Sequence, residues 1–192
     1  GNGTFQNLTM TRTGNICYLN VTTQPQGTIN YTIIVNDTVG NLAQTGPYFA
    51  FIDSIPPTTI QTVFPTLNNA SYTSQNWVYV NATFTETNPN NCILQYSNGS
   101  LANYSMTRSG DNCYLNLTNQ PQGIHNYTII VNDTSGNLAQ NGTFFLTIDQ
   151  TAPSQITLVS PSPDNNSKIY NGSATINATF TETNPNNCIL QY

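Results

Sequence analysis

The segment Thr85–Tyr96 reads TETNPNNCILQY, and the same twelve residues recur at Thr181–Tyr192. When the sequence is aligned with itself at an offset of 96 residues, 56 of the 96 aligned positions are identical. The run NYTIIVNDT, for example, begins at both Asn30 and Asn126. Because a fixed internal period indicates repeated structural units, we interpret the 192 residues as two periods of a tandem array.

Two proline-containing stretches divide the array into modules. They are DSIPPT at Asp53–Thr58 and DQTAPS at Asp149–Ser154. Proline with small polar residues after a strand-like run is typical of a linker. We therefore predict one complete module at residues 57–152. Residues 1–56 would be the C-terminal part of one module, and residues 153–192 the N-terminal part of the next.

Four cysteines follow the same period. Cys92 and Cys113 lie 21 residues apart in the complete module. Cys188 and Cys17 would have the same spacing if residue 1 of another copy followed residue 192. We predict both pairs as disulfides, since no further Cys or His lies at zinc-ligand spacing near any of the four. The sequence is therefore expected to be a repeating unit of a longer chain or fibre, the alternative being a cleaved or disordered terminus.

Alternating apolar residues predict the fold. In Asn76–Glu86 (NWVYVNATFTE) every second residue is apolar, as in a strand with one buried face. Similar runs recur, and turn signals such as DTSGN at Asp133–Asn137 separate them. About seven short strands per period predict an all-β fold, a two-sheet antiparallel β-sandwich of the immunoglobulin-like type. The residues expected to face inward are Val78, Val80, Ala82, Phe84, Cys92, Leu94, Tyr96, Cys113, Leu115, Leu117, Tyr127, Ile129, Val131, Phe144, Leu146 and Ile148.

The composition favours an extracellular glycoprotein. Only 6% of residues are charged, against about a quarter in a typical domain. On a strand, the Asn and Thr of a glycosylation sequon share one face, so a sugar there would point to solvent. Together with paired cysteines, this indicates an oxidising location at a cell surface. The candidate sites for covalent N-linked glycans are Asn2, Asn7, Asn20, Asn30, Asn36, Asn69, Asn81, Asn98, Asn103, Asn116, Asn126, Asn132, Asn141, Asn165, Asn171 and Asn177.

Other functional classes are disfavoured. A net charge of −5 with three basic residues does not suit nucleic acid, which requires clustered Lys and Arg. We find no apolar run of 18 residues and therefore predict no membrane span in this segment. No Ser, His and acid set recurs in both periods, so we expect neither an enzyme nor a cofactor. The one histidine, His125, has Ile29 as its counterpart and is expected to be a solvated surface residue.

Two runs, each followed by a linker, carry a family resemblance. VNDTVGNLAQ at Val35–Gln44 precedes FIDSIPPT, and VNDTSGNLAQ at Val131–Gln140 precedes TIDQTAPS. They resemble the closing hairpin and linker of immunoglobulin-like repeats found in tandem in prokaryotic surface proteins and adhesins. In sequon density the chain is similar to archaeal surface proteins. The resemblance implies rod-like arrays that project from a cell or build its outer layers. The cysteine pair and the scarcity of charge depart from that pattern.

Two sets of side chains are candidate sites. The recurring acids are interpreted first as turn and linker residues, with calcium binding at an interdomain junction as the alternative. These acids are Asp37 and Asp133, Asp53 and Asp149, and Glu86 and Glu182. Outward-facing apolar residues form a possible contact patch, unless glycans cover them. These are Trp77, Tyr79, Ile130 and Phe145.

The function that we predict is structural. The chain is expected to be a glycosylated, disulfide-stabilised repeat of an extracellular filament or cell-surface stalk, whose partners are copies of itself arranged head to tail. Either one long polypeptide carries the repeats, or separate subunits complete each other by strand donation. The alternative is an adhesin-type module that recognises a carbohydrate or a surface protein.

Overall fold

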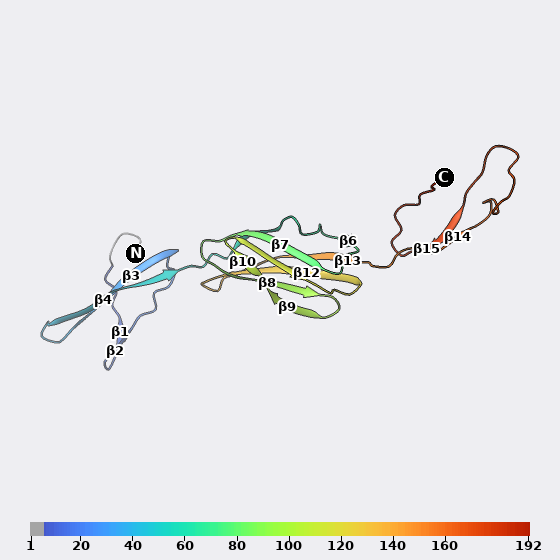
Figure 1. Ribbon diagram of the computed structural model, residues 1–192. Coiled ribbons are helices and arrows are strands. Elements are labelled where there is room, and N and C mark those ends of the chain that lie inside the picture. The colour runs from blue at the N-terminus through green and yellow to red at the C-terminus, as the bar shows by residue number, and fades with distance from the viewer. Residues whose placement is uncertain (1–5) are drawn as a thin grey trace.

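The computed structural model describes residues 6–192, so the sequon at Asn2 lies outside the described residues. All regular elements in this range are strands (Figure 1). Residues 6–192 contain no helix long and apolar enough to cross a membrane. The strands are β1 (Thr11–Thr13), β2 (Ile16–Tyr18), β3 (Gly27–Asn36), β4 (Leu42–Ile52), β5 (Thr58–Thr62), β6 (Ser71–Thr73), β7 (Val78–Thr85), β8 (Pro89–Ser97), β9 (Leu101–Ser105), β10 (Thr107–Ser109), β11 (Asn112–Leu117), β12 (Gly123–Asp133), β13 (Leu138–Ile148), β14 (Ser154–Leu158) and β15 (Ala178–Thr181).

Strands β5 to β13 form a two-sheet β-sandwich, called the central sandwich below. One sheet has the order β10-β11-β7-β5, and the other has the order β6-β13-β12-β8-β9. Every pairing is antiparallel except that of β6 with β13. The predicted all-β sandwich is thus confirmed. The structure adds two three-residue strands at sheet edges, β6 and β10, which are too short to show an alternating pattern.

Alternation along the strands fills the space between the sheets. In β7, Val78, Val80, Ala82 and Phe84 are at most 4% exposed, while the residues between them are half-buried. The predicted inward set is correct, although Leu115 and Phe144 are only partly buried against the core. Fully burying one such aliphatic side chain contributes about 1.5–3 kcal/mol. Burial of these side chains therefore stabilises the central sandwich.

Two segments flank the central sandwich at opposite ends (Figure 1). The N-terminal flank, residues 6–56, contains the pairs β1–β2 and β3–β4. The C-terminal flank, residues 153–192, contains the pair β14–β15. Each pair is a separate two-stranded sheet. The flanks are therefore built from the same kinds of strand as the central sandwich, but with fewer partners for each strand.

The β3–β4 hairpin repeats the β12–β13 hairpin down to its bulge. Tyr127 pairs with Phe144 but Ile129 with Asn141, so β13 contains one extra residue. A glycine accommodates the bulge: Gly142 has a φ of 106°, and a Cβ there would lie 2.6 Å from the ring of Phe144. The corresponding glycine of β4, Gly46, has a φ of 123°.

Candidate functional site

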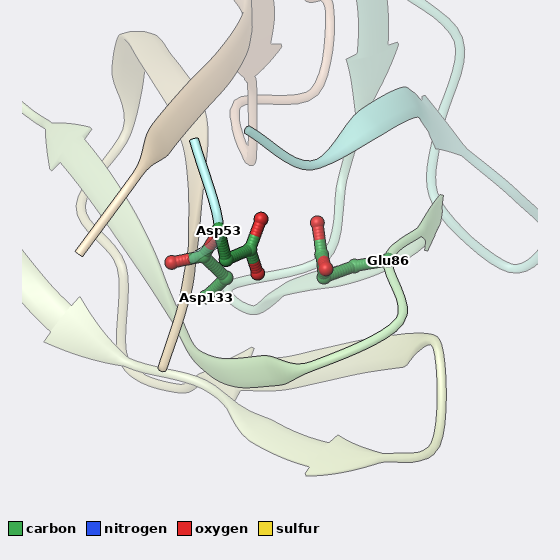
Figure 2. Close-up of side chains that lie close together, drawn as sticks. All are labelled: Asp53, Glu86 and Asp133. Atoms are coloured by element: carbon green, nitrogen blue, oxygen red, sulfur yellow. The ribbon is translucent and has the colours of Figure 1, made fainter. Parts of the chain in front are cut away.

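Three carboxylates meet where the chain enters the central sandwich. Asp53 follows β4, Glu86 follows β7, and Asp133 ends β12. One carboxylate oxygen from each lies within 4.8 Å of the others. Figure 2 shows the three side chains turned toward one another. Asp53, Glu86 and Asp133 are called the acidic cluster below. Residues from the linker and from the end of β7 also line a cleft of about 410 Å³ beside it.

The buried member of the cluster is fixed by its own turn. One Asp133 carboxylate oxygen accepts the backbone N–H groups of Ser135 and Asn137, both at 2.9 Å. The other oxygen accepts the Asn137 side-chain amide at 2.7 Å. This is the hairpin turn that DTSGN predicts, with Gly136 at a φ of 90°. These hydrogen bonds thus replace the contacts with water that the carboxylate loses on burial.

Side-chain amides attach the linker to the sandwich. The same Asn137 amide also donates to the backbone carbonyl of Asp53 at 3.1 Å. The Asn88 amide donates to the Asp53 carboxylate at 3.4 Å, and the Asn88 backbone N–H donates to Glu86 at 2.9 Å. Two asparagines therefore join the linker, the end of β7 and the β12–β13 turn in one network.

The hydrogen bonds determine the charge state of the turn acids. Burial acts to raise the pKa of Asp133, but hydrogen bonds from the Asn137 side chain and from backbone N–H groups outweigh it, and the pKa is lowered. The Asn41 side chain lowers the pKa of Asp37 in the corresponding turn. The Asn184 side chain lowers the pKa of Asp149. These three carboxylates are therefore ionised at neutral pH.

The sequence grouped these acids at a junction, and the structure brings Asp53, Glu86 and Asp133 together. Calcium takes six to eight oxygen ligands, of which three carboxylates supply a part. Calcium binding here stays the alternative to the interpretation of these acids as turn and linker residues. The other three acids are divided. Asp149 accepts from the Asn184 side chain at 3.0 Å, and Glu182 accepts from the Asn184 backbone N–H at 3.0 Å. Asp37 lies in the N-terminal flank.

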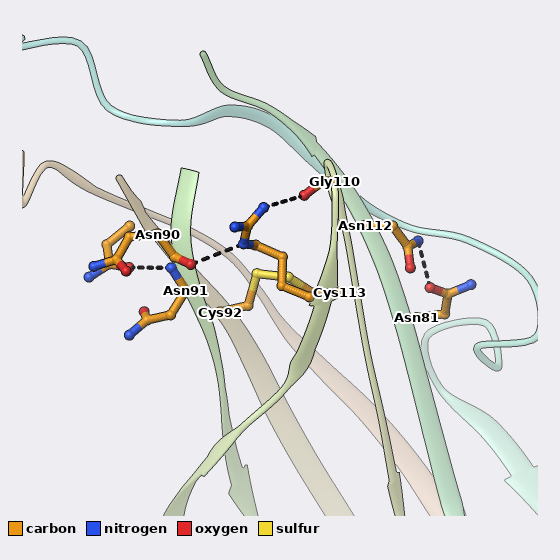
Figure 3. The surroundings of a disulfide bond; sticks show 9 residues. Asn81, Asn90, Asn91, Cys92, Gly110, Asn112 and Cys113 are labelled. Atoms are coloured by element: carbon orange, nitrogen blue, oxygen red, sulfur yellow. Dashed lines mark hydrogen bonds between the residues drawn. A yellow bond between two sulfur atoms is a disulfide. The ribbon is translucent and has the colours of Figure 1, made fainter. Parts of the chain in front are cut away.

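The Cys92–Cys113 disulfide joins the two sheets (Figure 3). Cys92 lies in β8 of the five-stranded sheet and Cys113 in β11 of the four-stranded sheet. Both are at most 1% exposed, and their Cα atoms are 6.4 Å apart. Beside the disulfide, Arg108 of β10 donates to the Asn90 carbonyl at 3.0 Å and to the Gly110 carbonyl at 2.9 Å. Cys17 and Cys188 are free thiols in this chain.

The glycosylation candidates differ in accessibility. In residues 57–152, Asn69, Asn98, Asn103 and Asn116 are exposed, whereas Asn81, Asn126, Asn132 and Asn141 are half-buried. A glycan attaches to the side-chain nitrogen, which in Asn81 donates to the Phe64 carbonyl and in Asn141 to the Ile60 carbonyl. In the flanks the described candidates are all exposed: Asn7, Asn20, Asn30, Asn36, Asn165, Asn171 and Asn177.

The four residues of the predicted contact patch lie on two sheets. Trp77 and Tyr79 belong to the outer side of the four-stranded sheet, where Tyr79 stacks on Tyr114. Ile130 and Phe145 belong to the outer side of the five-stranded sheet. Trp77 and Phe145 are exposed, and Tyr79 and Ile130 are half-buried. The structure therefore does not bring the four together on one surface.

His125 is buried, so the prediction of a solvated surface histidine was wrong. It is 1% exposed, its Nδ1 lies 2.7 Å from the Tyr96 hydroxyl, and its Nε2 lies 2.8 Å from the Pro121 carbonyl. A carbonyl only accepts, so Nε2 carries a hydrogen and donates it to Pro121. His125 is in phase with Tyr127 and Ile129 on β12. That alternation was the signal that sequence reasoning missed.

Comparisons with known proteins identify no family. No protein-family model and no curated protein matches the chain. Among solved structures, an endo-β-1,4-mannanase from Thermotoga petrophila is similar to 52% of this chain at 10% identity, with a TM-score of 0.40. An engineered protein is similar to 50% of it at 9% identity, with a TM-score of 0.38. The matches cover only 21% and 20% of those chains. Similarity at these levels indicates neither a shared fold nor a shared activity.

Proposed function

We propose that this chain is a non-catalytic structural repeat of an extracellular filament or cell-surface stalk, whose partners are further copies of itself. The observation that carries the proposal is the contrast along the chain. A closed, disulfide-bridged sandwich lies between two flanks that expose the apolar residues of incomplete sheets. Large exposed apolar surfaces mark contact sites, and here they occur at both ends of the sandwich.

The central sandwich suits a load-bearing role. Its core resists separation of the sheets, and the Cys92–Cys113 disulfide prevents the sheets from parting completely. Closing a 21-residue loop stabilises a domain by about 3 kcal/mol. The Asn88 and Asn137 amides restrict the linker that leads into the sandwich. A pulling force along the chain would therefore be resisted by disulfide-bridged modules and by the restrained linkers between them.

An extracellular location is part of the proposal. Protein disulfides persist mainly outside the cytoplasm, and the exposed sequons, such as Asn69, Asn103 and Asn116, are accessible to glycosylation. N-linked sugars would keep this charge-poor surface soluble and would shield exposed strand edges from unwanted pairing. The resemblance to surface-protein repeats agrees with this location.

Electron microscopy of the native protein, purified from its source cells, tests the proposal. We expect filaments or stalks with an axial repeat of roughly 60 to 80 Å per 192 residues, from strands of seven to ten residues at about 3.3 Å each plus linkers. Glycopeptide mass spectrometry should find sugars at the exposed sequons. Dispersed monomers that bind a carbohydrate or a surface protein would instead favour an adhesin.

A further inference from the structure

The two flanks carry the two halves of a second sandwich. We propose that residues 153–192 of a second copy cover the exposed apolar face of the N-terminal flank, in the register in which β5–β8 cover β9–β13 in the central sandwich. This inference rests on the proposed function and specifies how its copies would join. Four features support it: an exposed apolar face, a strand that matches it, polar contacts whose two partners lie in different flanks, and a pair of cysteines.

The apolar face lies on β3. Tyr31 is 48% and Val35 is 50% exposed, although their equivalents in β12, Tyr127 and Val131, are 3% and 0% exposed. The sequence NYTIIVND is identical in the two strands. What differs is the neighbour, because β8 pairs along β12 in the central sandwich. The face of β3 therefore has the residues of a core without the strand that would bury them.

The matching strand is residues 185–192 of the C-terminal flank. Its sequence, PNNCILQY, is the same as that of the segment which forms β8. In the central sandwich Tyr127 pairs with Tyr96, Ile129 with Leu94 and Val131 with Cys92. Moving each of these residues by one period gives three pairs between two copies. They are Tyr31 with Tyr192, Ile33 with Leu190 and Val35 with Cys188, the second residue of each pair coming from the second copy.

The opposing sheet is also supplied by the C-terminal flank. The inward residues of β7 are Val78, Val80, Ala82 and Phe84, and one period later the chain has Ala174, Ile176, Ala178 and Phe180. All four positions remain apolar. Ile176 is 46% exposed and Phe180 is 38% exposed in this chain. The second copy would therefore bring a complementary apolar face as well as an edge strand.

Some polar contacts of the central sandwich join two residues whose counterparts, one period away, lie in different flanks. Arg108 contacts both the Gly110 carbonyl and the Asn90 carbonyl. In the N-terminal flank Arg12 keeps the corresponding contact to Gly14, at 2.6 Å. The counterpart of Asn90 is Asn186, in the C-terminal flank.

The contact of the Asn137 amide is a second one whose counterparts are separated in this way. The Asn137 amide joins its turn to the Asp53 carbonyl. Asn41 already holds the equivalent turn at Asp37, with its side-chain amide 2.6 Å from the carboxylate. Asp149, the counterpart of Asp53, lies before the C-terminal flank. Joining two copies would restore the whole network, with Asn41 of one facing Asp149 of the other.

The same register places Cys17 opposite Cys188 of the second copy, as Cys113 faces Cys92. Two thiols must lose two protons and two electrons to form the bond. A small-molecule disulfide such as oxidised glutathione is the oxidant: one protein disulfide forms, and two glutathione thiols are released. The product is a covalent link between copies.

Isotope mixing of the full 192-residue chain tests the register. Chains labelled with ¹⁵N are mixed with an equal amount of unlabelled chains and oxidised with oxidised glutathione, and disulfide-linked peptides are then identified by mass spectrometry. We expect Cys17–Cys188 peptides that contain one labelled and one unlabelled half. Linked peptides of uniform label alone, with no mixed-label peptides among them, would mean that each chain closes on itself, which overturns the proposal. Loss of Cys92–Cys113 in favour of scrambled pairs would also overturn it.

Adjacent substitutions on β3 provide a matched pair. Ile33→Asp places a charge on the inward face, at the equivalent of fully buried Ile129, whereas Ile34→Asp changes the outward face. Sedimentation of the unoxidised protein should show that Ile33→Asp weakens association at least tenfold and Ile34→Asp less than threefold. Intact Cys92–Cys113 in both variants shows that the central sandwich is folded. Equal effects of the two substitutions would contradict the register.

The inference and the proposed function can fail separately. Native filaments that lack Cys17–Cys188 linked peptides would overturn the inference and leave the structural function standing. Mixed-label linked peptides together with native protein that forms no filament or stalk would support the inference and overturn that function. Cys188→Ser provides a further check, because it should abolish the covalent link while association persists.

Discussion

At the scale of single residues, the junction depends on side chains that act in pairs. Asp133 is buried and charged because Asn137 and the turn backbone donate to it. The repeat places Asp37 and Asn41 in the same arrangement. Aspartate in such a turn is a structural acid, whose charge is necessary to the conformation rather than to chemistry.

Acid should therefore weaken the central sandwich through Asp133. Its pKa is lowered in the folded state, so the stability that it contributes is present above the unfolded pKa of about 3.9 and is lost as the pH falls through the folded value. Urea unfolding between pH 5 and pH 2, followed by fluorescence of the single tryptophan, Trp77, measures this loss. Asp133→Asn should be less stable at pH 5 and show a shallower decline. An unchanged slope would contradict the assignment.

The acidic cluster yields a second prediction at this scale. Three carboxylates within 4.8 Å repel each other, so Glu86→Gln should raise the unfolding free energy by roughly 0.2 to 1 kcal/mol in buffer with chelator. If the alternative interpretation holds and calcium binds here, calcium chloride raises the Tm of the unmodified protein more than that of Glu86→Gln. Equal shifts in both proteins would place any bound ion elsewhere.

The sequence predicted the location of these residues better than their environment. Period and turn chemistry placed Asp53, Glu86 and Asp133 at a junction. The roles of Asn88 and Asn137 could not be predicted, because an asparagine's partners depend on how separate strands approach. The prediction for His125 was wrong because its position in the alternation of β12, in phase with Tyr127 and Ile129, determines its burial despite its polar side chain.

At the scale of elements, the hairpins are the most regular feature of the chain. Both β3–β4 and β12–β13 contain a bulge beside a glycine, and in both a turn that begins with aspartate connects the two strands. Alternation predicted the inward faces of β12 and β13 correctly. It did not predict which strands share a sheet. Consequently the outward residues Trp77 and Ile130 were grouped although they lie on different sheets.

The bulge in β13 should tolerate only glycine. In Gly142→Ala the new Cβ meets the Phe144 ring, and the φ of 106° is strained for alanine. We expect the unfolding free energy to fall by roughly 1 to 3 kcal/mol in urea denaturation. Thr143→Ala, at the neighbouring exposed position, is the control and should change stability little. A neutral Gly142→Ala would show that the bulge relaxes without cost.

At the scale of the whole molecule, a closed central sandwich alternates with open flanks. The spacing of Cys92 and Cys113 predicted a disulfide, but the order of strands within the sheets was needed to show that it joins them. The fold class followed from alternation alone. The proposal that a second copy covers the flanks rests on the repeat, because the apolar flank residues are exposed within one copy.

Removal of the sheet-joining disulfide should weaken the central sandwich as a unit. Cys92→Ala together with Cys113→Ala is expected to lower the unfolding free energy by about 3 kcal/mol, because the 21-residue loop is no longer closed in the unfolded chain. Trp77 fluorescence in urea reports this transition. Cys17→Ala together with Cys188→Ala should leave the same transition unchanged in buffer without reductant, in which Cys92–Cys113 stays closed. A similar loss in both double variants would show that the stabilisation is not local to the bridge.

The asparagine contacts at the linker have a consequence for where such a chain could operate. Dissolved ions screen attractions between exposed charges, but an amide that donates to a carbonyl, as Asn137 does to Asp53, is largely indifferent to them. This contact between the linker and the β12–β13 turn should therefore persist at low and at high salt concentration alike. A junction held by such amides would suit a protein that has to keep one shape as the salt concentration of its surroundings changes.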